Sequence, residues 1–187
     1  GMIRKTEREV VQRPQPSNPF EWIGDKLDQA RDWVVEESKE TIRLHKADYW
    51  WVPHFIETAI DSYELTGDAR DKDLARRLSE GLWGPYYYWW FNTFNDDLGW
   101  FMLAQLRAFE VTKDRFWLDD AKKLHARIRE DLDDTYGGGV WWKRDGTRFK
   151  NVPINAPFVI GSMKLFRHTG EPHHRTDALD VYAWMER

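Results

Sequence analysis

The sequence predicts an all-α protein built from stacked αα-hairpins. Two observations predict this fold: apolar residues recur at helical spacing along most of the chain, and one short motif occurs three times in register. The motif consists of a threonine, a glycine or lysine and an acidic residue, and its threonines are Thr66, Thr112 and Thr169. Their spacing of 46 and 57 residues indicates an array of helical hairpins, which forms either an open solenoid or a closed α/α toroid.

The apolar stripes place the helices in order along the chain. Residues 1–18 are polar, include prolines and lack the apolar segment of a signal peptide, so we expect them to be flexible. An apolar stripe predicts a helix within residues 19–46. Three later stripes, with apolar residues three and four positions apart, predict helices over 52–63, 98–109 and 117–132.

The register of the repeat continues past each turn. Apolar residues recur nine, twelve and sixteen positions after each threonine, which predicts a second helix that begins at the acidic residue of the motif. The residues at these positions are Ala75, Ala121 and Ala178; Leu78, Leu124 and Val181; and Leu82, Ile128 and Met185. Each unit is therefore a helix, a tight turn and a returning helix.

One segment interrupts the helical pattern between the second and third repeats. It contains three consecutive glycines at 137–139 and an Asp145-Gly146 pair between aromatic residues. Glycine permits backbone angles that other residues avoid, and Asp-Gly in such a setting is typical of a β-hairpin turn. We therefore predict a short β-hairpin insertion near 137–151, with an ordinary surface loop as the alternative.

The composition argues against several classes of function. The net charge is −4, and lysine and arginine are scattered instead of forming a basic stripe, so we expect no nucleic-acid partner. No apolar run approaches the roughly twenty residues of a membrane span, so we expect no membrane partner. The chain has no cysteine, which excludes disulfides and thiolate metal sites. If Met2, which follows Gly1, is the native start, the expected localisation is cytoplasmic.

Two adjacent carboxylates, Asp96 and Asp97, stand where a helix is predicted to begin, just after an aromatic run at 86–91. Paired carboxyl groups among aromatic rings suit the cleavage of a glycosidic bond, because the rings stack on sugars while the carboxyl groups act as nucleophile and acid/base. The alternative is that both residues only complement the helix N-terminus. The twelve tryptophans of the chain indicate either a sugar-stacking surface or a wide packed core.

Residues 45–187 resemble glycoside hydrolase family 76, the endo-acting α-1,6-mannanases. The resemblance rests on short segments in a fixed order, which are Tyr49-Trp50-Trp51, Asn95-Asp96-Asp97-Leu98-Gly99-Trp100, Gly137-Gly138-Gly139-Val140-Trp141-Trp142, and Lys150-Asn151 followed by Asn155. It implies an (α/α)6 toroid with a sugar cleft at one end and a retaining mechanism. It further implies Asp96 as the nucleophile and Asp97 as the general acid/base.

Further candidates to contact the sugar are aromatic and polar residues of the same region. They are Trp51, His54, Asn95, Trp100, Trp141, Trp142, Lys150, Asn151 and Asn155. If residues 141–142 lie in a strand, the two tryptophans alternate and at most one faces the sugar. Structural roles are the alternatives for His54 and Trp100. We expect no cofactor, and no metal, because His173-His174 has no carboxylate at ligand spacing.

The chain carries three repeats, whereas six hairpins close a toroid. We therefore predict a partial α/α-toroid-like glycoside hydrolase domain over 19–187, either a piece of a longer protein or a natural half-length relative. Its open edge is expected to be apolar and covered by a homo-oligomer. The predicted partner is an α-mannan-type polysaccharide or oligosaccharide. Two other functions remain open: a non-catalytic carbohydrate-binding protein on this partial fold, and a helical interaction scaffold.

Overall fold

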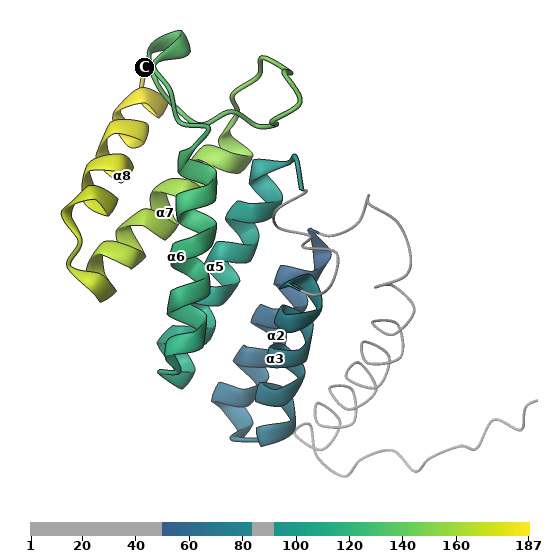
Figure 1. Cartoon of the computed structure of the whole chain (residues 1–187). Helices are drawn as coiled ribbons and strands as arrows, with labels where there is room; N and C mark the ends of the chain where they lie inside the picture. The colour runs from purple at the N-terminus through teal and green to yellow at the C-terminus, as the bar shows by residue number, and fades with distance from the viewer. Residues whose placement is uncertain (1–49, 84–91) are drawn as a thin grey trace, which may run out of the picture.

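The computed structural model describes residues 50–83 and 92–187, which form helices joined by turns and one longer loop (Figure 1). The elements are α2 (Trp51–Thr66), α3 (Ala69–Trp83), α5 (Asn95–Thr112), α6 (Arg115–Arg129), the short 3-10 helix η1 (Thr135–Gly137), α7 (Val152–Thr169) and α8 (Pro172–Met185). No strand forms within these two ranges, so the predicted all-α class is confirmed for them.

Consecutive helices pair into three antiparallel hairpins, α2 with α3, α5 with α6, and α7 with α8 (Figure 1). The first helices of the hairpins form one layer, because α5 packs against both α2 and α7. These three helices begin at the same end of the molecule, where the loop between α6 and α7 also lies (Figure 1). The fold therefore gathers three helix N-termini and one long loop at one end.

The three repeated motifs form the same turn at the ends of α2, α5 and α7. At Thr66 the hydroxyl donates a hydrogen bond of 2.8 Å to the carbonyl four residues earlier and accepts one of 3.1 Å from the N–H two residues later. The same two bonds form at Thr112 and Thr169. The residue after each threonine is left-handed, with φ of 70° at Gly67, 58° at Lys113 and 73° at Gly170.

The hydrophobic core lies between the helices and follows the predicted register. The residues nine and twelve positions after each threonine are all buried, which are Ala75, Ala121, Ala178, Leu78, Leu124 and Val181. The largest fully buried side chains, Trp117, Phe101 and Phe158, come from α6, α5 and α7. One continuous core therefore joins the hairpins, and it fixes the helices whose N-termini carry the candidate site.

Gly99 allows α5 and α7 to approach closely just below those N-termini. A Cβ atom at this position would lie 3.1 Å from Cβ of Pro157 and 3.3 Å from Cδ1 of Ile154. Both separations are shorter than an ordinary van der Waals contact between carbon atoms. Glycine in the segment Asp96-Asp97-Leu98-Gly99 therefore sets the distance between two helices at the site.

The β-hairpin predicted near 137–151 is wrong. In place of two paired strands, the segment makes isolated bridges with residues outside it, Val140 with Leu132 and Lys143 with Phe94. One backbone hydrogen bond, from the N–H of Trp142 to the carbonyl of Phe149 (2.9 Å), joins its two arms. The backbone groups bind the ends of neighbouring helices, so no ladder forms between the arms, and the segment is an irregular loop.

Three predictions lie outside the described residues: the flexible segment 1–18, the helix within 19–46, and the aromatic run 86–91. Among the helices that the structure describes, none has the length and apolar character needed to span a membrane.

The last hairpin exposes large apolar side chains. On α7 these are Val152, Ile160 and Met163, and on α8 they are Leu179 and Tyr182. The apolar open edge and its coverage by a homo-oligomer both stay predictions.

Candidate active site

Asp96 and Asp97 lie in the first turn of α5, as predicted. The N-cap residue is Phe94, which offers no side-chain hydrogen bond to the helix. Both carboxyl groups lie at the positive end of the helix dipole, which favours negative charge. Neither aspartate is the N-cap residue itself, but their place in the first turn leaves the interpretation that they complement the helix N-terminus open beside the catalytic one.

The carboxyl group of Asp96 is partly withdrawn from water. Its Oδ1 is shielded from solvent and has no hydrogen-bond partner within the described ranges. Burial raises the pKa of Asp96, while hydrogen bonds from the Trp142 side chain and from backbone N–H groups act in the opposite direction. A shielded, unpaired carboxyl oxygen is costly to a fold and is typical of a functional site.

The carboxyl group of Asp97 is oriented by Asn92, which precedes the helix. Nδ2 of Asn92 donates a hydrogen bond of 2.9 Å to Oδ2 of Asp97. Oδ1 of the same amide accepts a bond of 2.8 Å from the N–H of Phe94. Asn92 is buried, so both ends of its amide are fixed by the protein. The sequence signal for it was an asparagine two residues before Phe94, the spacing of an Asx turn.

Asn95 ties the long loop to the start of α5. Its N–H donates to the carbonyl of Trp142 (2.9 Å), and its Nδ2 donates to the carbonyl of Trp141 and to Oδ2 of Asp131 (both 2.8 Å). Nε of Arg144 lies 2.6 Å from the same Asp131 oxygen. Asn95 is fully buried. It was a candidate to bind sugar, and the structure gives it a structural role, because its amide is enclosed by the loop.

The two adjacent tryptophans contact different partners. The indole of Trp142 hydrogen-bonds Asp96 and packs against the core. The indole N–H of Trp141 donates instead to Oδ2 of Asp133 (2.8 Å), and Nζ of Lys150 lies 4.5 Å from its ring centroid. Trp142 is therefore the tryptophan that reaches the carboxylate pair.

Lys150 and Asn155 hold the loop together instead of facing a ligand. Nζ of Lys150 lies within 3.0 Å of four loop oxygens, two of them from Asp133, and its side chain is 2% exposed. The fully buried amide of Asn155 accepts from the N–H of Val140 (2.7 Å) and donates to the carbonyls of Val140 (3.1 Å) and Asn151 (2.8 Å). The prediction that these two side chains contact sugar is therefore wrong, because both are buried and bonded to the loop. Oδ1 of Asn151, by contrast, is shielded and has no hydrogen-bond partner in the described chain.

An aromatic cluster lies at the N-terminal ends of α2 and α5. Trp50 and Trp51 stack with ring centroids 4.1 Å apart, and they are 39% and 49% exposed. The ring of His54 meets Trp50 at 5.7 Å and Trp100 at 5.4 Å. Trp50 was missing from the predicted site, although it stands beside Trp51 in the sequence.

Helical spacing links this aromatic cluster to the carboxylates. Trp100 follows Asp97 by three residues and Asp96 by four, so the three side chains share one face of α5. The arrangement can therefore hold a ring-shaped polar molecule, with aromatic surfaces for its apolar faces and two carboxyl groups for a reaction at one of its atoms. Three histidines from α6 and α8 come together elsewhere, with one ring nitrogen of each within 4.8 Å of the others.

The sequence matches the family model of glycosyl hydrolase family 76 over residues 29–187. A comparison with curated proteins gave no match. Among solved structures, a protein from Listeria innocua is 30% identical with a TM-score of 0.68, over 73% of this chain and 40% of that one. The α-1,6-mannanase of a Salegentibacter species is 27% identical with a TM-score of 0.68, over 83% of this chain and 50% of that one.

An inactive variant of the Salegentibacter enzyme, with two consecutive aspartates replaced by alanine, has been solved with α-1,6-mannotetrose. It is 29% identical to this chain, with a TM-score of 0.68, over 73% of this chain and 40% of that one. The chain thus spans 40–50% of the length of these three structures, and the shared part has the fold of the corresponding part of their α/α toroids.

Proposed function

Since the chain belongs to glycosyl hydrolase family 76, we propose that it contributes the catalytic aspartates of a retaining endo-α-1,6-mannanase. The observation that carries the proposal is the position of Asp96 and Asp97 in the first turn of α5, beside Trp142 and the aromatic cluster. Consecutive aspartates are also the residues replaced in the inactive Salegentibacter variant.

This chain has two other pairs of consecutive aspartates, and their surroundings differ. Asp119 and Asp120 lie inside α6, where Asp120 is paired with Lys123 at 2.8 Å. Asp133 and Asp134 lie in the long loop, where Asp133 binds Lys150 and Trp141. Neither pair stands at a helix N-terminus among stacked aromatic rings, which favours Asp96 and Asp97 as the reacting groups.

We assign Asp96 as the nucleophile and Asp97 as the general acid/base. In the first step the Asp96 carboxylate attacks the anomeric carbon while Asp97 gives a proton to the leaving oxygen. In the second step Asp97 takes a proton from water, the water oxygen attacks the same carbon, and the Asp96 carboxylate is released. Burial raises the pKa of Asp96 and so opposes its ionisation, whereas the hydrogen bonds from Trp142 and from backbone N–H groups stabilise the carboxylate that this role requires. Asn92 keeps Asp97 oriented during both proton transfers.

We further propose that the tryptophans provide the sugar-stacking surface. Trp50 and Trp51 are exposed and already stacked, and Trp100 shares the carboxylate face of α5. Sugar rings present apolar C–H faces that pack on indoles, so successive mannose units would extend from Trp100 toward Trp51. Replacing Trp51 by alanine is then expected to weaken oligosaccharide binding more than it slows the chemical step.

Turnover of linear α-1,6-manno-oligosaccharides tests the proposal, with products separated by chromatography. Asp96→Asn and Asp97→Asn are compared with the parent protein and with Asp119→Asn, which changes an exposed aspartate of another consecutive pair. Cleavage that only the first two variants lose supports the proposal. Cleavage that survives in either variant contradicts it. Binding in calorimetry without cleavage by the parent would instead support a non-catalytic carbohydrate-binding role.

A further inference from the structure

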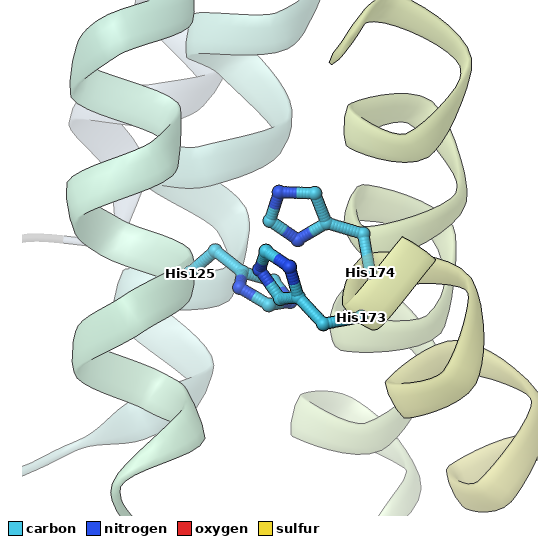
Figure 2. A group of neighbouring side chains, drawn as sticks. All are labelled: His125, His173 and His174. Atoms are coloured by element: carbon cyan, nitrogen blue, oxygen red, sulfur yellow. The ribbon is translucent and has the colours of Figure 1, made fainter. Parts of the chain in front are cut away.

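Three histidines from two hairpins converge at a point outside the candidate active site. His125 lies on α6, and His173 and His174 lie in the first turn of α8 (Figure 2). The ring centroids of His125 and His174 are 4.5 Å apart, and those of His173 and His174 are 3.9 Å apart. Each ring offers one nitrogen such that all three nitrogens lie within 4.8 Å of one another.

His174 is buried, and its two ring nitrogens lack hydrogen bonds within the described residues. The residue is 2% exposed. The nearest carboxylate oxygen, Oε2 of Glu171, is 3.5 Å from Nε2 of His174. Buried imidazole nitrogens without hydrogen bonds are unfavourable, and a metal ion that accepts the lone pair of the unprotonated nitrogen removes that nitrogen's share of the penalty.

The protein holds His125 in a fixed orientation. Its ring stacks on Phe158 with centroids 4.9 Å apart and an angle of 11° between the planes. Its Nε2 lies 2.9 Å from Oγ of Ser162 on α7. His173 is exposed and is free to adjust to an ion.

We propose that His125, His173 and His174 bind one Zn²⁺ ion. Zinc prefers imidazole nitrogens at about 2.0–2.1 Å, which places neighbouring ligand atoms of a tetrahedral site about 3.3 Å apart. The nitrogens, which lie within 4.8 Å of one another, need to close by up to about 1.5 Å to reach that geometry, mainly through rotation of the exposed His173 side chain. Glu171 lies at the rim, with Oε2 3.8 Å from Nδ1 of His173 and Oε1 paired with Nζ of Lys122 at 2.6 Å, and water completes the coordination.

Zinc at this point would join two hairpins. His125 belongs to the α5–α6 hairpin, whereas His173 and His174 belong to the α7–α8 hairpin. The ion binds the folded arrangement and not the dispersed ligands of the unfolded chain, so it stabilises the fold as its concentration rises. The sequence displayed only His173-His174, because the third ligand lies 48 residues earlier and on another helix.

Calorimetric titration with zinc sulfate tests the proposal, on the 187-residue chain without a histidine tag and after removal of metals with a chelator. We expect one equivalent to bind and the melting temperature to rise with added zinc. His173→Ala removes the exposed ligand with little risk to the fold, and we expect at least tenfold weaker binding. His168→Gln is the control, because it removes a histidine that pairs with Glu110 away from the cluster.

Cobalt gives an independent readout, because Co²⁺ in a tetrahedral nitrogen site absorbs strongly in the visible range whereas hydrated Co²⁺ absorbs weakly. The band is expected in the parent and in His168→Gln, and is expected to be lost in His173→Ala and His174→Gln. Absence of zinc binding to the parent would overturn the proposal. So would equal zinc affinity of the parent and His173→Ala.

Discussion

Nδ2 of Asn92 donates a hydrogen bond of 2.9 Å to Oδ2 of Asp97. Asn92 lies three residues before the first residue of α5, and Asp97 lies two residues after it. The same amide accepts from the N–H of Phe94, so it is fixed at both ends. This contact lets a residue outside the helix determine where the Asp97 carboxyl group points.

Asn92→Ala is expected to lower kcat by roughly 10- to 100-fold, with a smaller change in KM. The proton carried by Asp97 would no longer be aligned with the leaving oxygen, and misplacement by about 1 Å is enough for losses of this size. Steady-state kinetics on an α-1,6-manno-oligosaccharide measures the effect. An unchanged kcat would exclude a positioning role for Asn92.

Trp142→Phe is expected to shift the pH dependence of kcat/KM. The indole hydrogen bond lowers the pKa of Asp96 against the larger effect of burial, and phenylalanine keeps an aromatic ring but cannot donate. The pKa of Asp96 should therefore rise further in the variant. Since the nucleophile must be ionised, the acidic limb of the profile should move to higher pH. A limb at the same pH in both proteins would argue against Asp96 as the group that titrates there.

Lys113→Gly is expected to stabilise the protein by about 0.5–1 kcal/mol. Lys113 has φ of 58°, at the position where the other two turns have glycine. A left-handed conformation costs a residue with a side chain about 1–2 kcal/mol, and glycine avoids this cost. Part of the gain in stability is lost again, because glycine also gives the unfolded chain more conformational freedom. Urea denaturation measures the change. Gly170→Ala, at the equivalent position of the last repeat, should have the opposite sign.

Gly99→Ala is expected to destabilise the protein, because its Cβ would press on Pro157 and Ile154. Overpacking of this kind costs about 1–3 kcal/mol, whereas alanine gains up to about 1 kcal/mol in helix propensity. The displacement of α7 from α5 should also reduce turnover. Thermal unfolding and kinetics on the same preparation test both effects, and an equally stable, fully active variant would contradict the packing account.

The repeat was predictable from sequence because each turn is specified locally. Thr66 binds backbone groups only four residues back and two residues ahead, so the pattern of residues contains the whole interaction. The long loop was not predictable, because Val140 and Lys143 pair with Leu132 and Phe94 instead of with residues of the loop itself. Alternating side chains and an Asp-Gly pair indicate only a local preference for a β-hairpin. In this loop, backbone pairing with residues next to the ends of α5 and α6 replaces pairing between the two arms of the loop.

The candidate site also has a part that was predictable from sequence and a part that was not. The carboxylate pair was recognisable because both residues are adjacent and open a helix. The roles of Asn95 and Lys150 were not, since a polar residue in a motif looks the same whether its partner is a sugar or a loop carbonyl. Their partners, such as Asp131 and Asp133, are brought near only by the fold.

Proton NMR of α-1,6-mannotetraose during the first minutes of incubation with the protein tests directly whether Asp96 and Asp97 cleave the oligosaccharide by a retaining mechanism. We expect new reducing ends to form first as the α-anomer, as a retaining reaction on this pair requires, and we expect Asp96→Asn and Asp97→Asn to abolish the signal. Initial formation of the β-anomer, or cleavage that survives either substitution, would contradict this mechanism.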